Sequence, residues 1–202
     1  YGASTVLPEL LDSPVHRLTV QGVRNPILGK NNPHYVPNDI ALNGTNLAFI
    51  TGPNSGGKTA FCKTLAQIQL LAQAGAYVPA ESAELSVADR IFYQTPEMNV
   101  LSDGEGRFGT ELKRTKAIFL ASTSRSLVIL DELSEGTTSQ EKLEISANIL
   151  EGFHKKGNNT LLITHNHELV DVFQQQKIGL ARQVEFLNDD PTHRLIPGIS
   201  RI

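Results

Sequence analysis

Hydrophobic runs and helical periodicities alternate along most of this chain. Residues 46–51 form a short apolar run that enters a glycine-rich turn, which predicts a buried strand followed by a loop. The stretch after the turn has apolar residues at helical spacing, namely Phe61, Leu65, Ile68 and Ala72. The first unit of the fold is therefore predicted to be strand, loop and helix.

Two further apolar runs, at 127–130 and 161–164, predict buried strands, and we expect a helix after each. The inner face of the first helix is expected to carry Leu143, Ala147 and Leu150, and the second helix is marked by Leu169, Val172 and Phe173. Another helix is expected from about Thr110 to Ser122. Strands that alternate with helices favour an α/β architecture with a largely parallel sheet.

The two ends of the chain have a different pattern. Runs at 15–20, 39–42, 178–186 and 194–196 predict antiparallel strands, and residues 188–191 supply a turn between the last two. We therefore expect an α/β fold in which a mostly parallel sheet flanked by helices is joined by a smaller antiparallel β subdomain.

Composition narrows the class of protein. The chain has 202 residues, 40% of them hydrophobic, which is enough for one core. The chain has 18 lysines and arginines and 21 aspartates and glutamates, a net charge of -3. This charge argues against a broad basic surface that binds nucleic acid without other domains. A single cysteine, Cys62, excludes an intrachain disulfide and fits a reducing compartment, so we expect a cytoplasmic protein. The uncharged stretches contain Asn, Gly, Gln or Pro and predict no membrane span.

The beginning of the chain indicates a domain of a longer protein. Tyr1 stands first, with no basic and apolar leader before the domain. Residues 1–14 are predicted to be a linker from a preceding domain, and residues 15–202 are predicted to form one domain.

The strongest motif lies between the first predicted strand and its helix. Gly52-Pro53-Asn54-Ser55-Gly56-Gly57-Lys58-Thr59 satisfies G-x-x-x-x-G-K-S/T, a loop whose backbone N–H groups wrap a phosphate at a helix amino end. Lys58 would then reach the β- and γ-phosphates, and the Thr59 hydroxyl would bind Mg²⁺. A glycine-rich turn without a ligand is the alternative, and the flanking strand and helix argue against it.

Polar residues that follow the next two strands complete this chemistry. Asp131 would hold the Mg²⁺ shell, and Glu132 would orient or deprotonate the attacking water, if their strand neighbours the strand at 46–51. His165 ends the following strand, where it can hydrogen-bond the γ-phosphate or the water. Each assignment has an alternative. The first is that Asp131 and Glu132 only cap the end of a strand, and the second is that His165 and His167 bind a metal ion. The phosphate loop argues against the first alternative, and the lack of further ligands argues against the second.

Residues 104–109 formally match the dinucleotide motif G-x-G-x-x-G, with Asp131 22 residues beyond the last glycine. The preceding stretch at 96–103 is polar and contains proline, unlike the buried strand that such a fold requires. We expect this glycine-rich turn to open a helix instead, which makes a second helix amino end available to an anion.

The motifs, in this order, resemble the ATPase domain of the MutS family of DNA mismatch repair proteins, a branch of the ABC-type ATPases. The resemblance covers roughly residues 22–201 and is most specific at 50–59, 77–80, 89–92, 126–132, 135–139 and 164–169. It implies a P-loop ATPase of ABC type that binds ATP and Mg²⁺. It also implies that two such domains sandwich two nucleotides, as a homodimer with composite sites.

The resemblance also implies roles for individual residues. Tyr35 would stack on adenine, with Asn38 beside it, although Tyr35 is alternatively an ordinary packing residue. Nucleotide binding would extend through the loop to Ala60. Catalysis would involve Lys58, Glu132 and His165, and the metal would lie at Thr59 and Asp131. The turn at Gly106 and Arg107 would complete the site of the partner protomer.

Several positions depart from the family pattern. Gly106 and Arg107 stand where the family usually has serine and threonine, so a hydroxyl expected at the partner's γ-phosphate is missing, and Arg107 is a candidate arginine finger. Asn25 replaces the usual histidine, and Glu135 the usual arginine. These changes indicate a divergent MutS-like protein.

The expected function is Mg²⁺-dependent ATP hydrolysis that drives dimer or clamp changes in a DNA-transaction protein. The chain has no Phe-x-Glu motif, so DNA contacts are expected from regions outside it. The main alternative is a nucleotide-gated switch that hydrolyses little ATP. A transporter-type ABC subunit is disfavoured because no L-S-G-G-Q-like signature is present, and a plain structural domain would require an empty phosphate loop.

Overall fold

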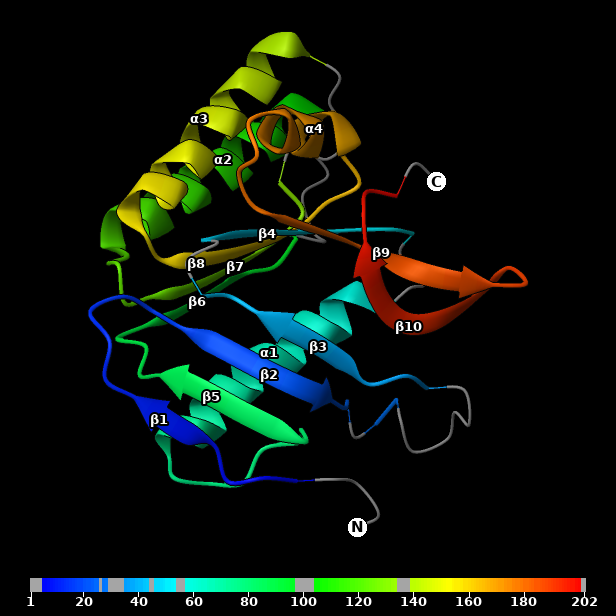
Figure 1. Cartoon of the computed structure of the whole chain (residues 1–202). Helices are drawn as coiled ribbons and strands as arrows, with labels where there is room; N and C mark the ends of the chain where they lie inside the picture. Colours follow the sequence, from blue (N-terminus) through cyan, green and yellow to red (C-terminus); the bar gives the residue numbers. More distant parts are fainter. Residues whose placement is uncertain are drawn as a thin grey trace.

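A six-stranded sheet lies at the centre of the structure and separates two layers (Figure 1). This computed structural model describes residues 5–25, 27–28, 35–43, 46–53, 57–96, 104–133 and 139–200, with no side chains for residues 104, 105 and 107. The strands in spatial order are β10 (Asp190–Pro197), β9 (Leu180–Leu187), β4 (Leu47–Thr51), β8 (Asn159–Ile163), β7 (Leu127–Asp131) and β6 (Ile91–Gln94). All neighbours are parallel except the β9–β10 hairpin.

A smaller four-stranded sheet lies beside the first, in the spatial order β1, β5, β2 and β3. Its strands are β1 (Glu9–Leu11), β2 (Leu18–Val23), β3 (Asn38–Ala41) and β5 (Ser82–Ser86). Strand β2 is antiparallel to both of its neighbours, whereas β1 is parallel to β5. The predicted α/β fold with a mostly parallel sheet is confirmed, and the smaller sheet is antiparallel except at its β1 edge.

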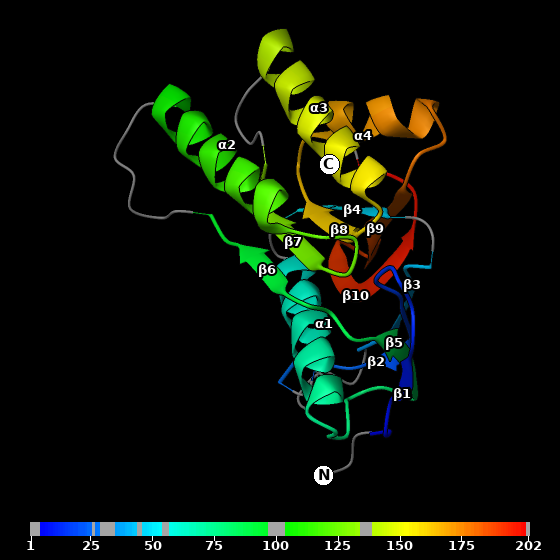
Figure 2. The same ribbon diagram turned by 90° about the vertical axis from the view of Figure 1, so that its left-hand side faces the viewer.

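Helices cover both faces of the central sheet. They are α1 (Lys58–Gln73), α2 (Gly104–Ala121), α3 (Gln140–Lys156) and α4 (His167–Gln175). Figures 1 and 2 show α2, α3 and α4 on one face, and α1 with the smaller sheet on the other. In the ranges that the structure describes, no helix has the length and apolar character needed to cross a membrane.

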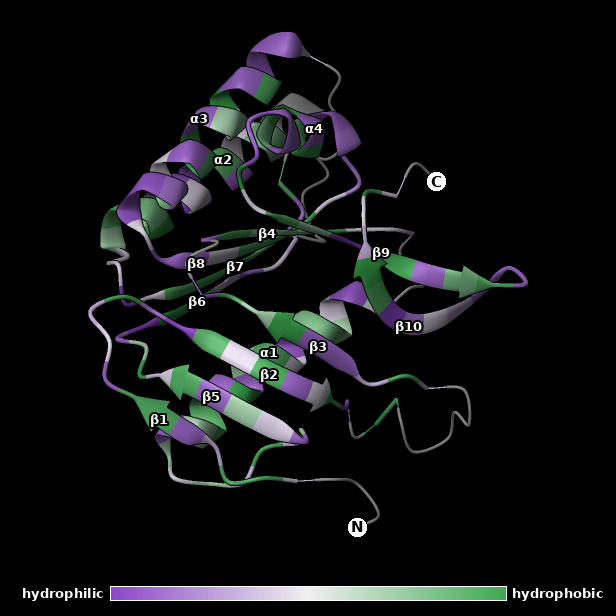
Figure 3. Ribbon diagram, in the orientation of Figure 1, coloured by the Kyte–Doolittle hydropathy of each residue, from purple (hydrophilic) through white to green (hydrophobic). Residues whose placement is uncertain are grey.

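The alternation of side chains along β4 explains the two cores. Ala48 and Ile50 face α1 and the smaller sheet, whereas Leu47 and Phe49 face α3 and α4. Both faces are covered, so every residue of β4, β7 and β8 is buried. Figure 3 shows hydrophobic residues along β4 and β7, and many hydrophilic residues on α3, which is open to solvent on one side.

The predicted central elements are confirmed to within two residues. Strands β4, β7 and β8 occupy the three apolar runs, and α1 buries Phe61, Leu65, Ile68 and Ala72. Helix α4 is also present, but Val172 is 40% exposed and Val170 is buried in its place.

Other sequence predictions were wrong in detail. The antiparallel pairing of β9 with β10 is confirmed, but this hairpin joins the central sheet, parallel to β4, rather than the smaller antiparallel sheet. Helix α2 starts at Gly104 rather than near Thr110, and buried Phe108 in its first turns lies 5.2 Å from the Lys142 ammonium of α3. This packing outweighs the low helix propensity of the glycines. The segment 1–14, expected as a linker, contributes β1, which pairs with β5.

His16 is a buried polar link between β2, α1 and β8. Its Nε2 lies 2.8 Å from Gln69 Oε1, and its Nδ1 lies 2.8 Å from Asn159 Nδ2. The Gln69 amide nitrogen donates to the Ser86 carbonyl, so the Gln69 oxygen is the acceptor for His16. His16 therefore carries its proton on Nε2 and accepts from Asn159 on Nδ1, which is the neutral form.

This arrangement predicts a loss of stability in mild acid. Burial holds the pKa of His16 below its ordinary value of 6.5, against the opposing effects of the Gln69 hydrogen bond and the Asp89 charge. Below about pH 6.5 the unfolded chain binds a proton that the folded chain does not, so stability falls by up to about 1.4 kcal/mol per pH unit until the folded-state pKa is reached. Urea unfolding at a series of pH values measures this slope. The variant His16→Gln should show a smaller slope, and an unchanged slope would contradict the assignment.

Candidate functional site

The phosphate loop connects β4 to α1. Gly52 and Gly57 have φ values of 139° and 80°, a region that residues with a Cβ rarely adopt, and Gly57 is the residue before the first turn of α1. Lys58 is buried, and its ammonium donates to the carbonyls of Gly52 and Pro53, the latter at 2.9 Å. Residues Asn54, Ser55 and Gly56 lie outside the described residues. The described part of the loop thus folds around the Lys58 ammonium.

Thr59 and Asp131 meet at the end of this loop. The Thr59 hydroxyl donates to Asp131 Oδ2 at 2.9 Å. The prediction supposed that the strand ending in Asp131 neighbours the strand that enters the phosphate loop, but β8 lies between β4 and β7. The contact forms because α1 packs against the face of β8, which brings Thr59 within reach of the end of β7.

The surroundings of Asp131 affect its charge. The side chain is 5% exposed, and burial raises the pKa of its carboxyl, with a further increase from the charge of Glu132. The Thr59 hydrogen bond and the charges of Lys58 and Lys63 oppose this shift in pKa. A buried carboxylate is stabilised by positive charge, so Asp131 is suited to bind a metal ion in addition to its interaction with the nearby lysines.

Glu132 and His165 lie at the same edge of the central sheet. Asp131 pairs in register with Ile163, and the Glu132 N–H donates to the Ile163 carbonyl at 2.9 Å. His165 follows two residues after Ile163 and is half-buried, as Glu132 is. Glu132 has a φ of 65°, an unusual backbone conformation for this residue type that recurs at functional sites. The carboxyl ends of β7 and β8 therefore bring both predicted catalytic residues to the edge where Asp131 lies.

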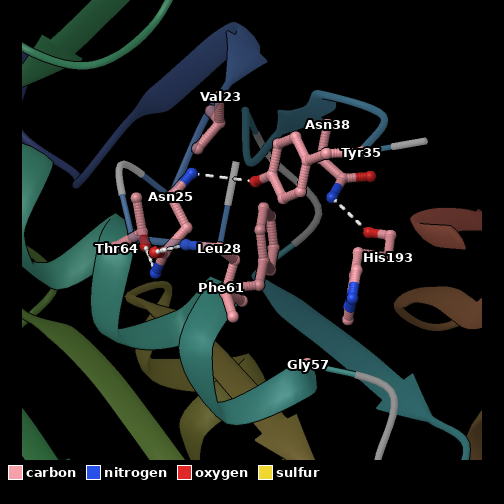
Figure 4. Close-up of a pocket in the computed structure, with 9 residues that line it drawn as sticks. All are labelled: Val23, Asn25, Leu28, Tyr35, Asn38, Gly57, Phe61, Thr64 and His193. Atoms are coloured by element: carbon pink, nitrogen blue, oxygen red, sulfur yellow. Dashed lines mark hydrogen bonds between the residues drawn. The ribbon is translucent and has the colours of Figure 1, made fainter. Parts of the chain in front are cut away.

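A crevice beside the loop holds the residues predicted to bind the base (Figure 4). It is lined by Val23, Asn25, Leu28, Tyr35, Asn38, Gly57, Phe61, Thr64 and His193. An open cleft of about 510 Å³ adjoins it and runs past Lys58, Thr59 and Ala60. A cleft of this size is typical of small-molecule sites. Tyr35 and Asn38 thus line one crevice with Gly57 of the phosphate loop.

His193 also lines this crevice, although no sequence motif includes it. It sits in β10 with a φ of 61°, at an irregularity in the pairing with β9. Its ring lies 6.1 Å from that of Tyr35, between centroids, and a Cβ built on Gly57 would stand 2.7 Å from its Nδ1. Because the β9–β10 hairpin carries it to the loop from a distant part of the sequence, no local pattern marks His193.

The predicted signature turn is part of a helix. Gly106 and Arg107 belong to the first turns of α2, and the side chain of Arg107 lies outside the described residues. Figure 2 shows the amino ends of α2 and α3 at the same outer end of the molecule, away from α1. The structure therefore does not bring Gly106 to the phosphate loop of its own chain.

The alternative metal pair at His165 and His167 gains no support. Asn166 between them caps α4, where its side-chain oxygen accepts from the Leu169 N–H at 3.2 Å. Within the described ranges, no group of three or more His, Cys, Asp or Glu residues could hold a metal ion.

The donor set fits a magnesium nucleotide. A hydroxyl and a carboxylate, from Thr59 and Asp131, are the hard oxygen ligands that Mg²⁺ prefers. The Lys58 ammonium and the amino end of α1 supply positive charge for phosphate. The absence of a side chain at Gly57 leaves room for the His193 ring, which a Cβ would meet at 2.7 Å.

Comparisons with known proteins show which family the chain resembles. A family profile described as MutS domain V matches residues 48–195. The chain is 38% identical over 202 residues to the DNA mismatch repair protein MutS of Rhodopirellula baltica, covering 96% of this chain and 22% of that protein. It is 40% identical over 201 residues to MutS of Dehalococcoides mccartyi, covering 92% and 23%. It is 40% identical over 152 residues to MutS 2 of Halobacterium salinarum, covering 74% and 18%. The chain thus spans about a fifth of the length of these relatives.

The contact between Gly57 and His193 predicts a specific cost for a side chain at this position. The variant Gly57→Ala should lower the free energy of unfolding by roughly 1–2 kcal/mol for the left-handed backbone, plus the cost of displacing His193. Gly75→Ala is the matched control, because its φ is 76° but nothing lies within 4 Å of the new Cβ. Denaturant unfolding should show Gly57→Ala to be the more destabilised. Equal losses, or no recovery when His193→Ala is added to Gly57→Ala, would contradict the contact.

Proposed function

We propose that this chain, which belongs to the MutS family and corresponds to its domain V, binds ATP with Mg²⁺ and hydrolyses it. We propose that residues 15–202 form most of the domain, that the preceding segment adds its edge strand β1, and that the arrangement is the ABC type of P-loop ATPase. The observation that carries the proposal is the 2.9 Å hydrogen bond from Thr59 to Asp131, beside the buried ammonium of Lys58. It joins the phosphate loop to the acidic strand end that a nucleotide hydrolase requires.

Each residue of the site has a separate role in the proposed binding and hydrolysis of ATP. Lys58 binds the β- and γ-phosphates, and residues 52–60 wrap them with backbone N–H groups. Thr59 and Asp131 hold the metal, which when bound neutralises charge on the phosphate oxygens. Glu132 orients the attacking water and accepts its proton, and His165 hydrogen-bonds the γ-phosphate or the water from the neighbouring strand. Catalysis then rests on positioning and on neutralised charge.

The base binds beside the loop. Tyr35 and His193 line the same crevice, and their rings are close enough to form a continuous aromatic wall. Arg24 lies with its guanidinium carbon 6.0 Å from the centre of the Tyr35 ring. We propose that adenine stacks against this wall while the triphosphate runs along the adjoining cleft towards Lys58 and Thr59.

The proposed working unit is a homodimer. The amino end of α2 stands away from the phosphate loop of its own chain, which supports the proposal that Gly106 and Arg107 act on a second copy. Arg107 is the proposed arginine finger of that composite site. The relatives are named DNA mismatch repair proteins, and we propose that the parent protein contacts DNA through parts outside this chain and uses ATP to change the dimer.

The variant Glu132→Gln tests the role of Glu132, because it should retain ATP binding and lose ATP hydrolysis. This variant keeps the shape of the side chain but removes the base, so ATP turnover should fall by about 10²- to 10⁴-fold. ATP affinity, measured by calorimetry, should stay close to that of the unmodified chain. Turnover at the parental rate in Glu132→Gln would rule out this role.

The dependence of the rate on protein concentration tests the dimer in the same assay. If a partner completes each site, the rate per protomer should rise with concentration and then level off, and Arg107→Ala should lower the plateau. A measurable rate that is constant over the whole range would contradict a composite site. ATP binding without turnover above the Glu132→Gln blank would favour the nucleotide-gated switch over the ATPase.

A further inference from the structure

Two asparagines hold the two rings of the aromatic wall, and neither role follows from the phosphate-loop motif. Asn25 lies in the segment after β2 and contacts Tyr35, whereas Asn38 begins β3 and contacts the backbone of β10 beside His193. All four residues line the same crevice, and Figure 4 shows their side chains around it.

Asn25 attaches the Tyr35 side of the wall to α1. Its side-chain oxygen accepts from the N–H groups of Ile27 and Leu28, both at 3.0 Å, which folds this segment into a turn. Its amide nitrogen donates to the Thr64 hydroxyl at 3.1 Å, which ties the turn to α1. The turn holds the Asn25 backbone N–H against the Tyr35 hydroxyl, at 2.8 Å.

The Thr64 hydroxyl is itself fixed. It is buried, and it donates to the Ala60 carbonyl at 2.9 Å within the first turns of α1. The chain of hydrogen bonds therefore runs from the end of the phosphate loop, through Thr64 and Asn25, to the Tyr35 ring. The position of Tyr35 is set relative to the loop that holds the phosphates.

Asn38 fixes the His193 side of the wall. It is 4% exposed, and its amide nitrogen donates to the His193 carbonyl at 2.7 Å. Its side-chain oxygen accepts from the Leu195 N–H at 2.8 Å. These two bonds span the irregular part of β10 where His193 has a positive φ, and they join the smaller sheet to the hairpin of the larger one.

We propose that Asn25 and Asn38 are positioning residues that set the two rings against which the base stacks, and so determine how strongly this site prefers a nucleotide to bare phosphate. This inference rests on the proposed ATP site. It assigns Asn38, which the sequence suggested as a direct nucleotide ligand, an indirect role through the backbone of β10. The ring positions are then a property of the folded chain, and the stacking geometry is prepared before the nucleotide arrives.

A pair of ligands isolates the base from the phosphates. Mg·ATP uses both the loop and the aromatic wall, whereas magnesium tripolyphosphate uses only the loop. Calorimetric titration of the 202-residue chain with each ligand gives the ratio of the two affinities. In the unmodified chain this ratio should favour ATP.

The ratio should fall about tenfold in Asn25→Ala and in Asn38→Ala, because each loses the hydrogen bonds that place one ring. Tyr35→Phe keeps the ring and removes only the hydroxyl, so the ratio should fall by roughly threefold. Asn25→Asp retains the acceptor for the two turn N–H groups but loses the donor to the Thr64 hydroxyl, so it should recover only part of the ratio. Tripolyphosphate affinity should change less than about twofold in the alanine variants, as it would not if the whole site collapsed.

Asn43→Ala is the matched control. Asn43 follows β3, is exposed, and bonds the Thr19 hydroxyl outside the crevice, so this variant should keep the ratio of the unmodified chain. Thermal unfolding of every variant identifies any that do not fold, and Tyr35→Phe preserves the test because it removes a single oxygen.

The outcomes separate this inference from the proposed function. If the unmodified chain binds neither ligand, or if Lys58→Ala weakens neither, the ATP site itself is wrong. If Lys58→Ala weakens both ligands but folded Asn25→Ala, Asn38→Ala and Tyr35→Phe keep the parental ratio, only the positioning role is wrong. An unmodified chain that binds ATP no better than tripolyphosphate also overturns that role.

Discussion

The hydrogen bond from the Thr59 hydroxyl to the Asp131 carboxylate joins the two halves of the site. Its donor belongs to α1 and its acceptor to the end of β7, and one strand, β8, separates β7 from the strand that leads into α1. The bond therefore requires α1 to pack against the face of β8, and buried residues of α1 and β8 supply that packing. A buried carboxylate is costly without a polar partner, so the fold and the site depend on the same contact.

The site takes residues from both sheets. Glu132 and His165 come from adjacent parallel strands, whose carboxyl ends meet at one edge. Tyr35 belongs to the segment that leads into the smaller sheet, and His193 comes from the terminal hairpin. Asn38 bonds across the gap between the sheets, so the aromatic wall forms only when both are folded and packed. The backbone conformations of Glu132, at the end of β7, and of His193, beside the bonds from Asn38, are unusual for their residue types.

Sequence patterns predicted the elements that a continuous run of hydrophobic residues marks. Continuous apolar runs marked β4, β7 and β8, and the loop motif marked the connection from β4 to α1, where Lys58 and Thr59 begin the helix. Strand β5 was not predicted, because the alternation of Ala83 and Leu85 with polar neighbours is too short to stand out. The direction of β9 depends on which strand it pairs with, and periodicity does not encode that. His193 was missed for a related reason, since its contact with Gly57 depends on the whole hairpin. The early start of α2 reflects tertiary packing of Phe108, which local propensity does not report.

The central claim is that Thr59 and Asp131 hold a metal beside a bound triphosphate. The most direct test is the ATP affinity of the chain with Mg²⁺ and with a chelator in its place, compared with that of Thr59→Val and Asp131→Asn. The account predicts that Mg²⁺ strengthens ATP binding by about tenfold or more in the unmodified chain, and that each variant loses most of this gain. An equal gain in the variants, or no effect of Mg²⁺ on ATP binding in the unmodified chain, would contradict it.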